Sequence, residues 1–154
     1  MKTHINRIKK RFWEFWKFKI FRYAVIIHVF YFILSLILTL VFLRDRNDFL
    51  VYYEGGKVFI NNLNELYNNN NYTRWPFRYF PISALFFVPF YLMGFDLGFI
   101  IFSLINLILN FLIFLILYKL IILIRREDHE QGDDRIVLYI SLFLIGLPNL
   151  FNYI

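Results

Sequence analysis

One polar stretch, residues 44–81, holds most of the side chains in this sequence that could do chemistry. It carries acids, bases, tyrosines, paired glycines and an asparagine tract, and it ends in an aromatic and basic run before Pro81. A carboxylate in such a stretch can act as a general base, and an arginine can bind phosphate oxygens with its planar fork. We therefore expect the rest of the chain to hold this stretch in place.

Apolar runs on both sides of this stretch predict an all-α integral membrane protein. Residues 23–43 and 97–118 contain no Asp, Glu, Lys or Arg, and a third run, residues 136–154, is also uncharged. Crossing the bilayer core takes about 20 helical residues. The chain has no cysteine, which excludes disulfides, Cys-type zinc sites and thiol catalysis.

The first 22 residues carry eight Lys and Arg side chains against a single acid, Glu14. These basic residues alternate with Phe and Trp, and the segment leads directly into the first apolar run. Basic flanks and tryptophans at the level of the lipid headgroups anchor a cytoplasmic N-terminus. Residues 1–22 are therefore predicted to form an amphipathic helix at the cytoplasmic face of the plasma membrane, and no nucleic-acid partner is expected.

A short apolar segment, residues 81–95, decides the predicted topology. It contains Pro89 and is too short for a comfortable span, so it suits an interfacial or re-entrant helix. The positive-inside rule then places the basic pair at 125–126 in the cytoplasm. The predicted arrangement has a cytoplasmic N-terminus, three transmembrane helices at 23–43, 97–124 and 136–154, an extracytoplasmic loop at 44–96 and a cytoplasmic loop at 125–135.

Local signals predict the structure inside the outer loop. Residues 48–61 suit a juxtamembrane helix along the membrane surface, with Asn47 as its N-cap. Gly55 and Gly56 interrupt that pattern at a cost in stability, so we expect a close packing contact at these glycines. Residues 61–72 are rich in asparagine and predict a loop.

A few polar residues elsewhere have both a functional and a structural interpretation. His28 lies inside the first predicted span, where an ionisable residue is a candidate for function, but a structural histidine near the interface is favoured. Asn106 and Asn110 share one helix face and are favoured as hydrogen-bonding groups between helices over substrate contacts. An acidic cluster in the cytoplasmic loop could suggest a metal site, which we do not favour: Glu127, Asp128, His129, Glu130, Asp133 and Asp134.

The order of elements in the outer loop resembles a known pattern. The elements, in order, are Asn47-Asp48-Phe49, Tyr52-Tyr53, Gly55-Gly56, Leu66-Tyr67, Phe77-Arg78-Tyr79-Phe80-Pro81 and Pro89. This series resembles the N-terminal part of glycosyltransferase family 87, in the GT-C superfamily of polytopic glycosyltransferases. The resemblance covers residues 20–154 as a pattern of apolar and polar segments, and residues 48–89 as a motif.

The resemblance implies a GT-C-like N-terminal module, with about three transmembrane helices and juxtamembrane or re-entrant helices in the first outer loop. It implies transfer of a hexose, commonly mannose, from a polyprenyl-phosphate donor to an acceptor hydroxyl. Asp48 occupies the position of the catalytic acid and would act as the base, with Asp45 as runner-up. The residues expected to bind the donor are Arg74, Arg78, Lys57, Tyr52, Tyr53 and Tyr79.

Each of these assignments has a structural alternative. Asp48 could be a first-turn acid favoured by the helix dipole, and Arg74 and Arg78 could be interface anchors. No nucleotide motif is visible, which agrees with a lipid-linked donor, and no cofactor or metal is expected. The partners expected are the lipid bilayer, the polyprenyl-phosphate sugar and the remainder of a split or truncated enzyme.

Length separates the chain from the family, whose members have more spans. The chain is therefore expected to be the N-terminal part of an enzyme, incomplete on its own. The alternative is a small non-catalytic accessory or structural membrane protein. Half of a transporter is a weaker third hypothesis, because the sequence shows neither internal repeats nor charged residues at mid-membrane positions.

Overall fold

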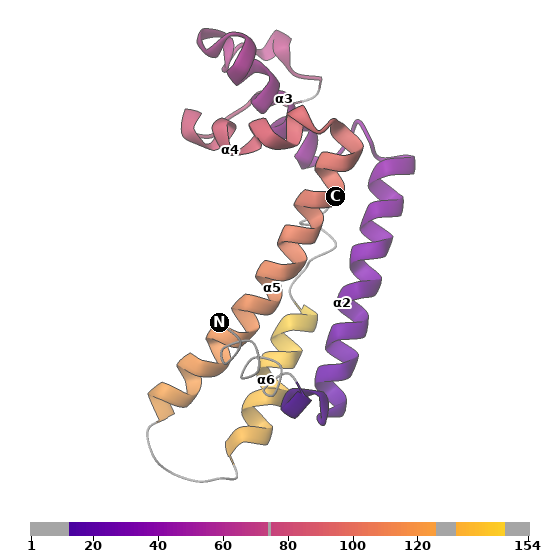
Figure 1. Cartoon of the computed structure of the whole chain (residues 1–154), viewed down its shortest axis with the longest axis vertical. Coiled ribbons are helices and arrows are strands. Elements are labelled where there is room, and N and C mark those ends of the chain that lie inside the picture. The colour runs from indigo at the N-terminus through magenta and orange to yellow at the C-terminus, as the bar shows by residue number, and fades with distance from the viewer. Residues whose placement is uncertain (1–12, 74, 126–131, 147–154) are drawn as a thin grey trace, which may run out of the picture. The chain divides into compact units, whose positions relative to one another are not determined.

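The computed structural model describes residues 13–73, 75–125 and 132–146, and within these ranges the chain is helical without a β-strand. The all-α prediction is confirmed for this part of the chain. Figure 1 shows the elements, which are α2 Lys19–Ile37, a π-helical turn η1 Leu38–Phe42, α3 Asp48–Asn61, two 3₁₀ turns η2 Leu63–Glu65 and η3 Asn69–Asn71, α4 Pro81–Leu92, α5 Phe95–Arg125 and α6 Gly132–Gly146.

Two of the described helices are long and apolar enough to cross a membrane. They cover Lys19–Phe42, with 24 residues, and Phe95–Ile121, with 27 residues. Only 17% and 11% of their most apolar stretches are buried, whereas the core helix of a soluble protein would be mostly buried. Helix α6 has 15 residues, and the rest of the third predicted span, residues 147–154, lies outside the described residues.

The chain forms two compact units, and α2 and α5 each contribute to both. The first unit contains residues 1–30 and 108–148. Its buried core consists of Phe15, Phe21, Ala24, Phe114, Ile136, Val137 and Ile140. The ring of Phe15 meets the rings of Phe114 and Tyr118 edge-on, with centroids 5.4 and 4.7 Å away.

The segment before α2 differs from the single amphipathic helix predicted for residues 1–22. Among its described residues, 13–16 are helical, a turn follows at residues 17–18, and α2 begins at Lys19. The turn places both Phe15 and Phe21 in one cluster, with their centroids 5.7 Å apart. Burial of aromatic area at this point favours a broken helix over a continuous one.

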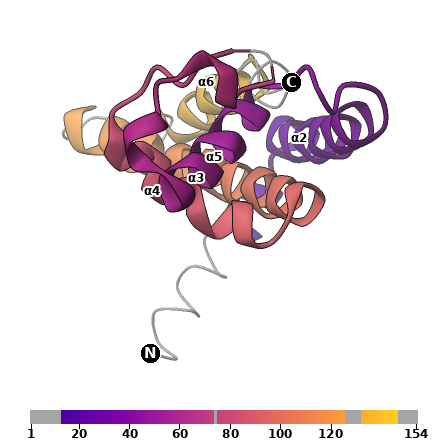
Figure 2. The same cartoon turned by 90° about the horizontal axis from the view of Figure 1, so that it is seen from above.

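Helices α3 and α4 pack side by side in the second unit, as Figures 1 and 2 both show. The contact is close because α3 presents glycines to it. A Cβ atom at Gly56 would lie 2.9 Å from the backbone carbonyl of Phe87, and one at Gly55 would lie 2.7 Å from the ring of Phe77. The expected packing contact at the paired glycines is therefore confirmed.

Helix α4 has 12 residues, three fewer than the predicted segment 81–95. It begins with Pro81, whose fixed φ suits the first helical turn. It ends because Gly94 adopts a positive φ of 82°, which glycine reaches without steric cost. Twelve helical residues extend about 18 Å, well short of the roughly 30 Å of a bilayer core.

Candidate functional site

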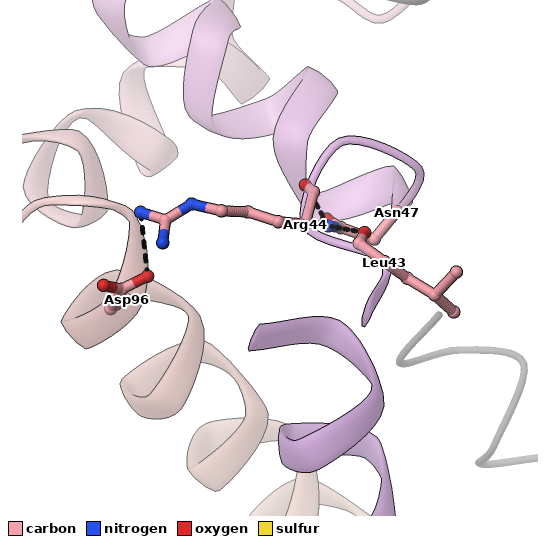
Figure 3. Close-up of polar contacts among 4 residues, drawn as sticks. All are labelled: Leu43, Arg44, Asn47 and Asp96. Atoms are coloured by element: carbon pink, nitrogen blue, oxygen red, sulfur yellow. Dashed lines mark hydrogen bonds and ion pairs between the residues drawn. The ribbon is translucent and has the colours of Figure 1, made fainter. Parts of the chain in front are cut away.

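Helix α3 starts at an asparagine cap, which Figure 3 shows in close-up. The Oδ1 atom of Asn47 accepts a hydrogen bond from the backbone N–H of Leu50 at 2.9 Å. Its Nδ2 atom donates to the carbonyls of Leu43 at 3.0 Å and Arg44 at 2.7 Å. The predicted N-cap is confirmed, and it makes Asp48 the first residue of the helix, with its side chain exposed.

An ion pair joins the two ends of the segment predicted as the outer loop, residues 44–96. The Nη2 atom of Arg44 lies 2.9 Å from Oδ1 of Asp96, at the start of α5 (Figure 3). The guanidinium also lies over the ring of Phe95, 5.0 Å from its centroid. Because both charged side chains are about half exposed, the pair contributes at most about 1 kcal/mol.

Four of the predicted site residues line one pocket of about 220 Å³. The lining residues are Asp48, Val51, Tyr52, Trp75, Pro76, Arg78 and Tyr79. The first three come from one face of α3, and the other four come from the segment that precedes α4. The pocket therefore combines a carboxylate, a guanidinium and aromatic rings from two parts of the chain.

Tyr79 is held at two points on the wall of this pocket. Its phenol oxygen accepts a hydrogen bond from the hydroxyl of Tyr52 at 2.9 Å, and its carbonyl accepts one from Tyr67 at 2.9 Å. The ring of Tyr52 stacks on that of Phe87, with centroids 4.6 Å apart and planes 13° apart. Both phenols at the pocket are thus placed by contacts within the protein.

The pKa of Tyr52 is raised above its usual value of 10.0. Burial is the largest cause, and the hydrogen bond to Tyr79, the electrostatic interaction with Tyr79 and the negative charge of Asp48 act in the same direction. Tyr52 therefore stays protonated at neutral pH and serves as a hydrogen-bond donor.

Neither Asp48 nor Arg78 uses its side chain in a hydrogen bond or ion pair within the described part of the chain. Both side chains are exposed. Each therefore keeps its full bonding capacity for a ligand. The carboxylate can accept a proton or a hydroxyl hydrogen bond, and the guanidinium can bind anionic oxygens.

The other predicted site residues lie elsewhere. Tyr53 faces away from this pocket and packs against Tyr91 and Phe95, with ring centroids 5.4 and 5.5 Å away. Lys57 lines a second pocket at the other end of α3. Arg74 lies outside the described residues, and the runner-up acid Asp45 is exposed without lining either pocket.

Val51 and Pro76 line the pocket although their residue types suggest no chemistry. Helical spacing could have found Val51, because residues three and four apart share a face, so Asp48, Val51 and Tyr52 belong together. Pro76 lies beside α3 because its segment packs on that helix, as in the contact of the following Phe77 with Gly55. That contact joins residues far apart in the sequence and leaves no local signal.

The described side chains contain no group of three or more His, Cys, Asp or Glu residues that could hold a metal ion. The acidic cluster between Glu127 and Asp134 lies outside the described side chains.

Comparisons with family models, with curated proteins and with solved structures found no match to this chain. The resemblance to glycosyltransferase family 87 thus rests on the residues of the outer loop.

Proposed function

We propose that this chain is the N-terminal part of a GT-C membrane glycosyltransferase that moves a hexose from a polyprenyl-phosphate donor to an acceptor hydroxyl. One observation carries the proposal: Asp48, Tyr52, Arg78 and Tyr79 line the same pocket. These four residues come from three separate elements of the predicted motif. Their convergence supplies a base and an anion-binding group beside aromatic rings that suit a sugar.

The proposed roles follow from the chemistry of glycosyl transfer. Asp48 takes the proton of the acceptor hydroxyl while that oxygen bonds to the anomeric carbon. The bond between the anomeric carbon and the phosphate oxygen breaks, and the lipid phosphate leaves with the electron pair. Arg78 binds the charge that grows on the phosphate, and Tyr52 and Tyr79 lie beside the sugar.

The proposal includes a membrane topology. Helices Lys19–Phe42 and Phe95–Ile121 cross the plasma membrane, with residues 136–154 as a third span. The N-terminus is cytoplasmic and residues 44–96 are extracytoplasmic, where a polyprenyl-phosphate sugar is presented. The short length of α4 and its exposed apolar side chains Ile82, Phe86 and Leu92 suit a helix at the membrane surface.

A transfer assay tests this proposal. Membranes from cells that produce this chain together with the remainder of the enzyme are supplied with polyprenyl-phosphate mannose, and incorporation of mannose is compared between the native chain, Asp48→Asn and Asp45→Asn. We expect Asp48→Asn to lower the rate at least about 100-fold, because a general base contributes about that much or more. Asp45→Asn is the matched control and should retain the rate.

Equal rates in all three proteins would remove Asp48 from the mechanism.

The alternative function is that of a small accessory membrane protein without catalysis. It is favoured by the exposure of Asp48, since a surface acid at a helix start needs no substrate. A total lack of transfer across several sugars and carriers would favour this alternative.

A further inference from the structure

A second pocket, of about 400 Å³, lies at the C-terminal end of α3. Its lining residues are Lys57, Val58, Asn61, Asn62, Glu65, Asn70 and Asn71. Val58 is the single apolar side chain among them. The two pockets use opposite ends of α3, about nine residues apart, which corresponds to roughly 14 Å along the helix axis.

Some of the asparagines build the wall of this pocket. The Nδ2 atom of Asn71 donates to the backbone carbonyl of Glu65 at 3.0 Å and to its carboxylate at 3.3 Å. Asn68 donates to the same carboxylate at 2.7 Å. Glu65 therefore holds Asn68 and Asn71 in place within residues 62–73, which we call the asparagine loop.

The loop is also fastened to α3 and to the core. The carboxylate of Glu54 accepts hydrogen bonds from the backbone N–H of Thr73, at 3.0 and 3.2 Å, and from its hydroxyl. The hydroxyl of Tyr72 donates to the carbonyl of Leu66, and both residues are buried. A wall that is held in place before binding loses little entropy when a ligand arrives.

The remaining polar side chains in the pocket are available. Within the described part of the chain, no side-chain hydrogen bond or ion pair is made by Lys57, Asn61, Asn62 or Asn70. Each asparagine amide offers two donors and an acceptor, and the lysine offers three donors. The pocket thus presents both kinds of hydrogen-bonding group to one space.

The charges of the pocket select a neutral ligand. An anion would meet the carboxylate of Glu65, and a cation would meet the ammonium of Lys57. An apolar ligand would leave the amides without partners at a cost in free energy. Adjacent hydroxyl groups, each both donor and acceptor, match the amides, and the volume lies in the usual range of about 300–1,000 Å³ for small-molecule sites.

We infer that the pocket between α3 and the asparagine loop is a binding site for a neutral carbohydrate. The inference is independent of glycosyl transfer, because it concerns binding alone. At roughly 14 Å from the first pocket along α3, a sugar bound here is too far from Asp48 to react. If transfer occurs, the site would hold the remote part of an acceptor that contains several sugars.

The test uses the full chain in lipid nanodiscs, since sugar-headed detergents would compete for the site. Binding of methyl α-mannoside and of maltose is measured by saturation-transfer NMR. The variant Asn61→Ala/Asn70→Ala removes two available amides. The matched control, Asn64→Ala/Asn69→Ala, removes two exposed asparagines of the same segment that do not line the pocket.

We expect at least one sugar to bind the native chain and the control with equal affinity. The pocket variant should bind about tenfold more weakly or worse, which corresponds to a loss of roughly 1.4 kcal/mol or more. Equal weakening in both variants, or no sugar signal from the native chain, would overturn the inference. Binding of inorganic phosphate in place of sugar, abolished by Lys57→Met, would also overturn it. Failure of the Asp48 transfer assay would leave this result unchanged.

Discussion

The hydroxyl of Tyr52 on α3 lies 2.9 Å from the hydroxyl of Tyr79, 27 residues further along the chain. This bond connects α3 to the segment that carries Arg78, so it closes one side of the pocket that contains Asp48. The two rings are 5.1 Å apart between centroids. The geometry of the candidate site therefore depends on a contact between the partly buried phenol of Tyr52 and the exposed phenol of Tyr79.

Replacing Tyr79 with phenylalanine should lower the pKa of Tyr52. The substitution removes the hydrogen bond and the charge of the neighbouring phenol, which are the second and third causes of the raised pKa. Burial remains, so the pKa of Tyr52 should stay above 10.0. Site-resolved NMR of carbon-labelled tyrosine during an alkaline titration measures the change.

Tyr67→Phe is the control for this titration, because Tyr67 donates to the backbone carbonyl of Tyr79 and not to its hydroxyl. It should leave the pKa of Tyr52 nearly unchanged. An equal decrease in Tyr67→Phe would mean that the position of Tyr79, and not its hydroxyl, controls Tyr52.

The loss of stability caused by alanine at Gly55 should be relieved by Phe77→Leu, whereas the loss caused by alanine at Gly56 should not. Gly56→Ala places a methyl group 2.9 Å from the backbone carbonyl of Phe87, and Gly55→Ala places one 2.7 Å from the ring of Phe77. Each should lower the free energy of unfolding by about 1–3 kcal/mol, as overpacking does. Phe77→Leu makes room beside residue 55, so it should partly offset Gly55→Ala and leave Gly56→Ala unrelieved.

Equilibrium unfolding in mixed lipid–detergent micelles measures these effects, with each single variant and each pair compared. Coupling between Gly55→Ala and Phe77→Leu should be favourable, and coupling between Gly56→Ala and Phe77→Leu should be close to zero. Equal coupling in both pairs would contradict the separate contacts of the two glycines.

Local sequence signals predicted part of this fold and of the candidate site. Asn47 and the helix that follows it were predictable because a cap and a helical face involve neighbours in the chain. The tight contact at Gly55 and Gly56 was predictable, but its partners Phe77 and Phe87 were not, since they lie more than 20 residues away.

The same distinction applies to the site residues. The grouping of Asp48 with Tyr52 follows from helical spacing, whereas their meeting with Arg78 and Tyr79 depends on how α4 packs on α3. Tyr53 was predicted beside Tyr52 because the two are adjacent in sequence. Adjacent helical residues point about 100° apart, and Tyr53 therefore packs against α5 residues such as Phe95.

Asn47→Ala should destabilise α3 by about 2 kcal/mol. It removes the cap acceptor for Leu50, which is worth about 1 kcal/mol, and the donors to two carbonyls. The carbonyl of Arg44 then lacks this bond, whereas that of Leu43 keeps the one from the N–H of Arg46. Asn47→Asp keeps the acceptor and loses the donors, so it should cost less. Hydrogen exchange at the amide of Leu50 reports the cap directly and should accelerate in Asn47→Ala alone.

Stability should fall with rising pH above about 10, and Tyr72 should account for part of this decrease. Burial, together with the nearby negative charge of Glu54, raises the pKa of Tyr72 to about 12 in the folded protein. The unfolded chain loses this proton near its usual value of 10.0, so between pH 10 and 12 it binds fewer protons than the folded chain. The free energy of unfolding therefore decreases with pH across this window.

Tyr72→Phe removes the ionising group and the hydrogen bond to the carbonyl of Leu66. The variant should be less stable than the native chain at neutral pH, by about 1 kcal/mol, because that carbonyl loses its partner. Its stability should then decrease less steeply between pH 10 and 12, so that the two curves converge. Parallel curves across this window would show that Tyr72 ionises at the same pH in the folded and unfolded states, and that its stabilising effect comes from packing and hydrogen bonding alone.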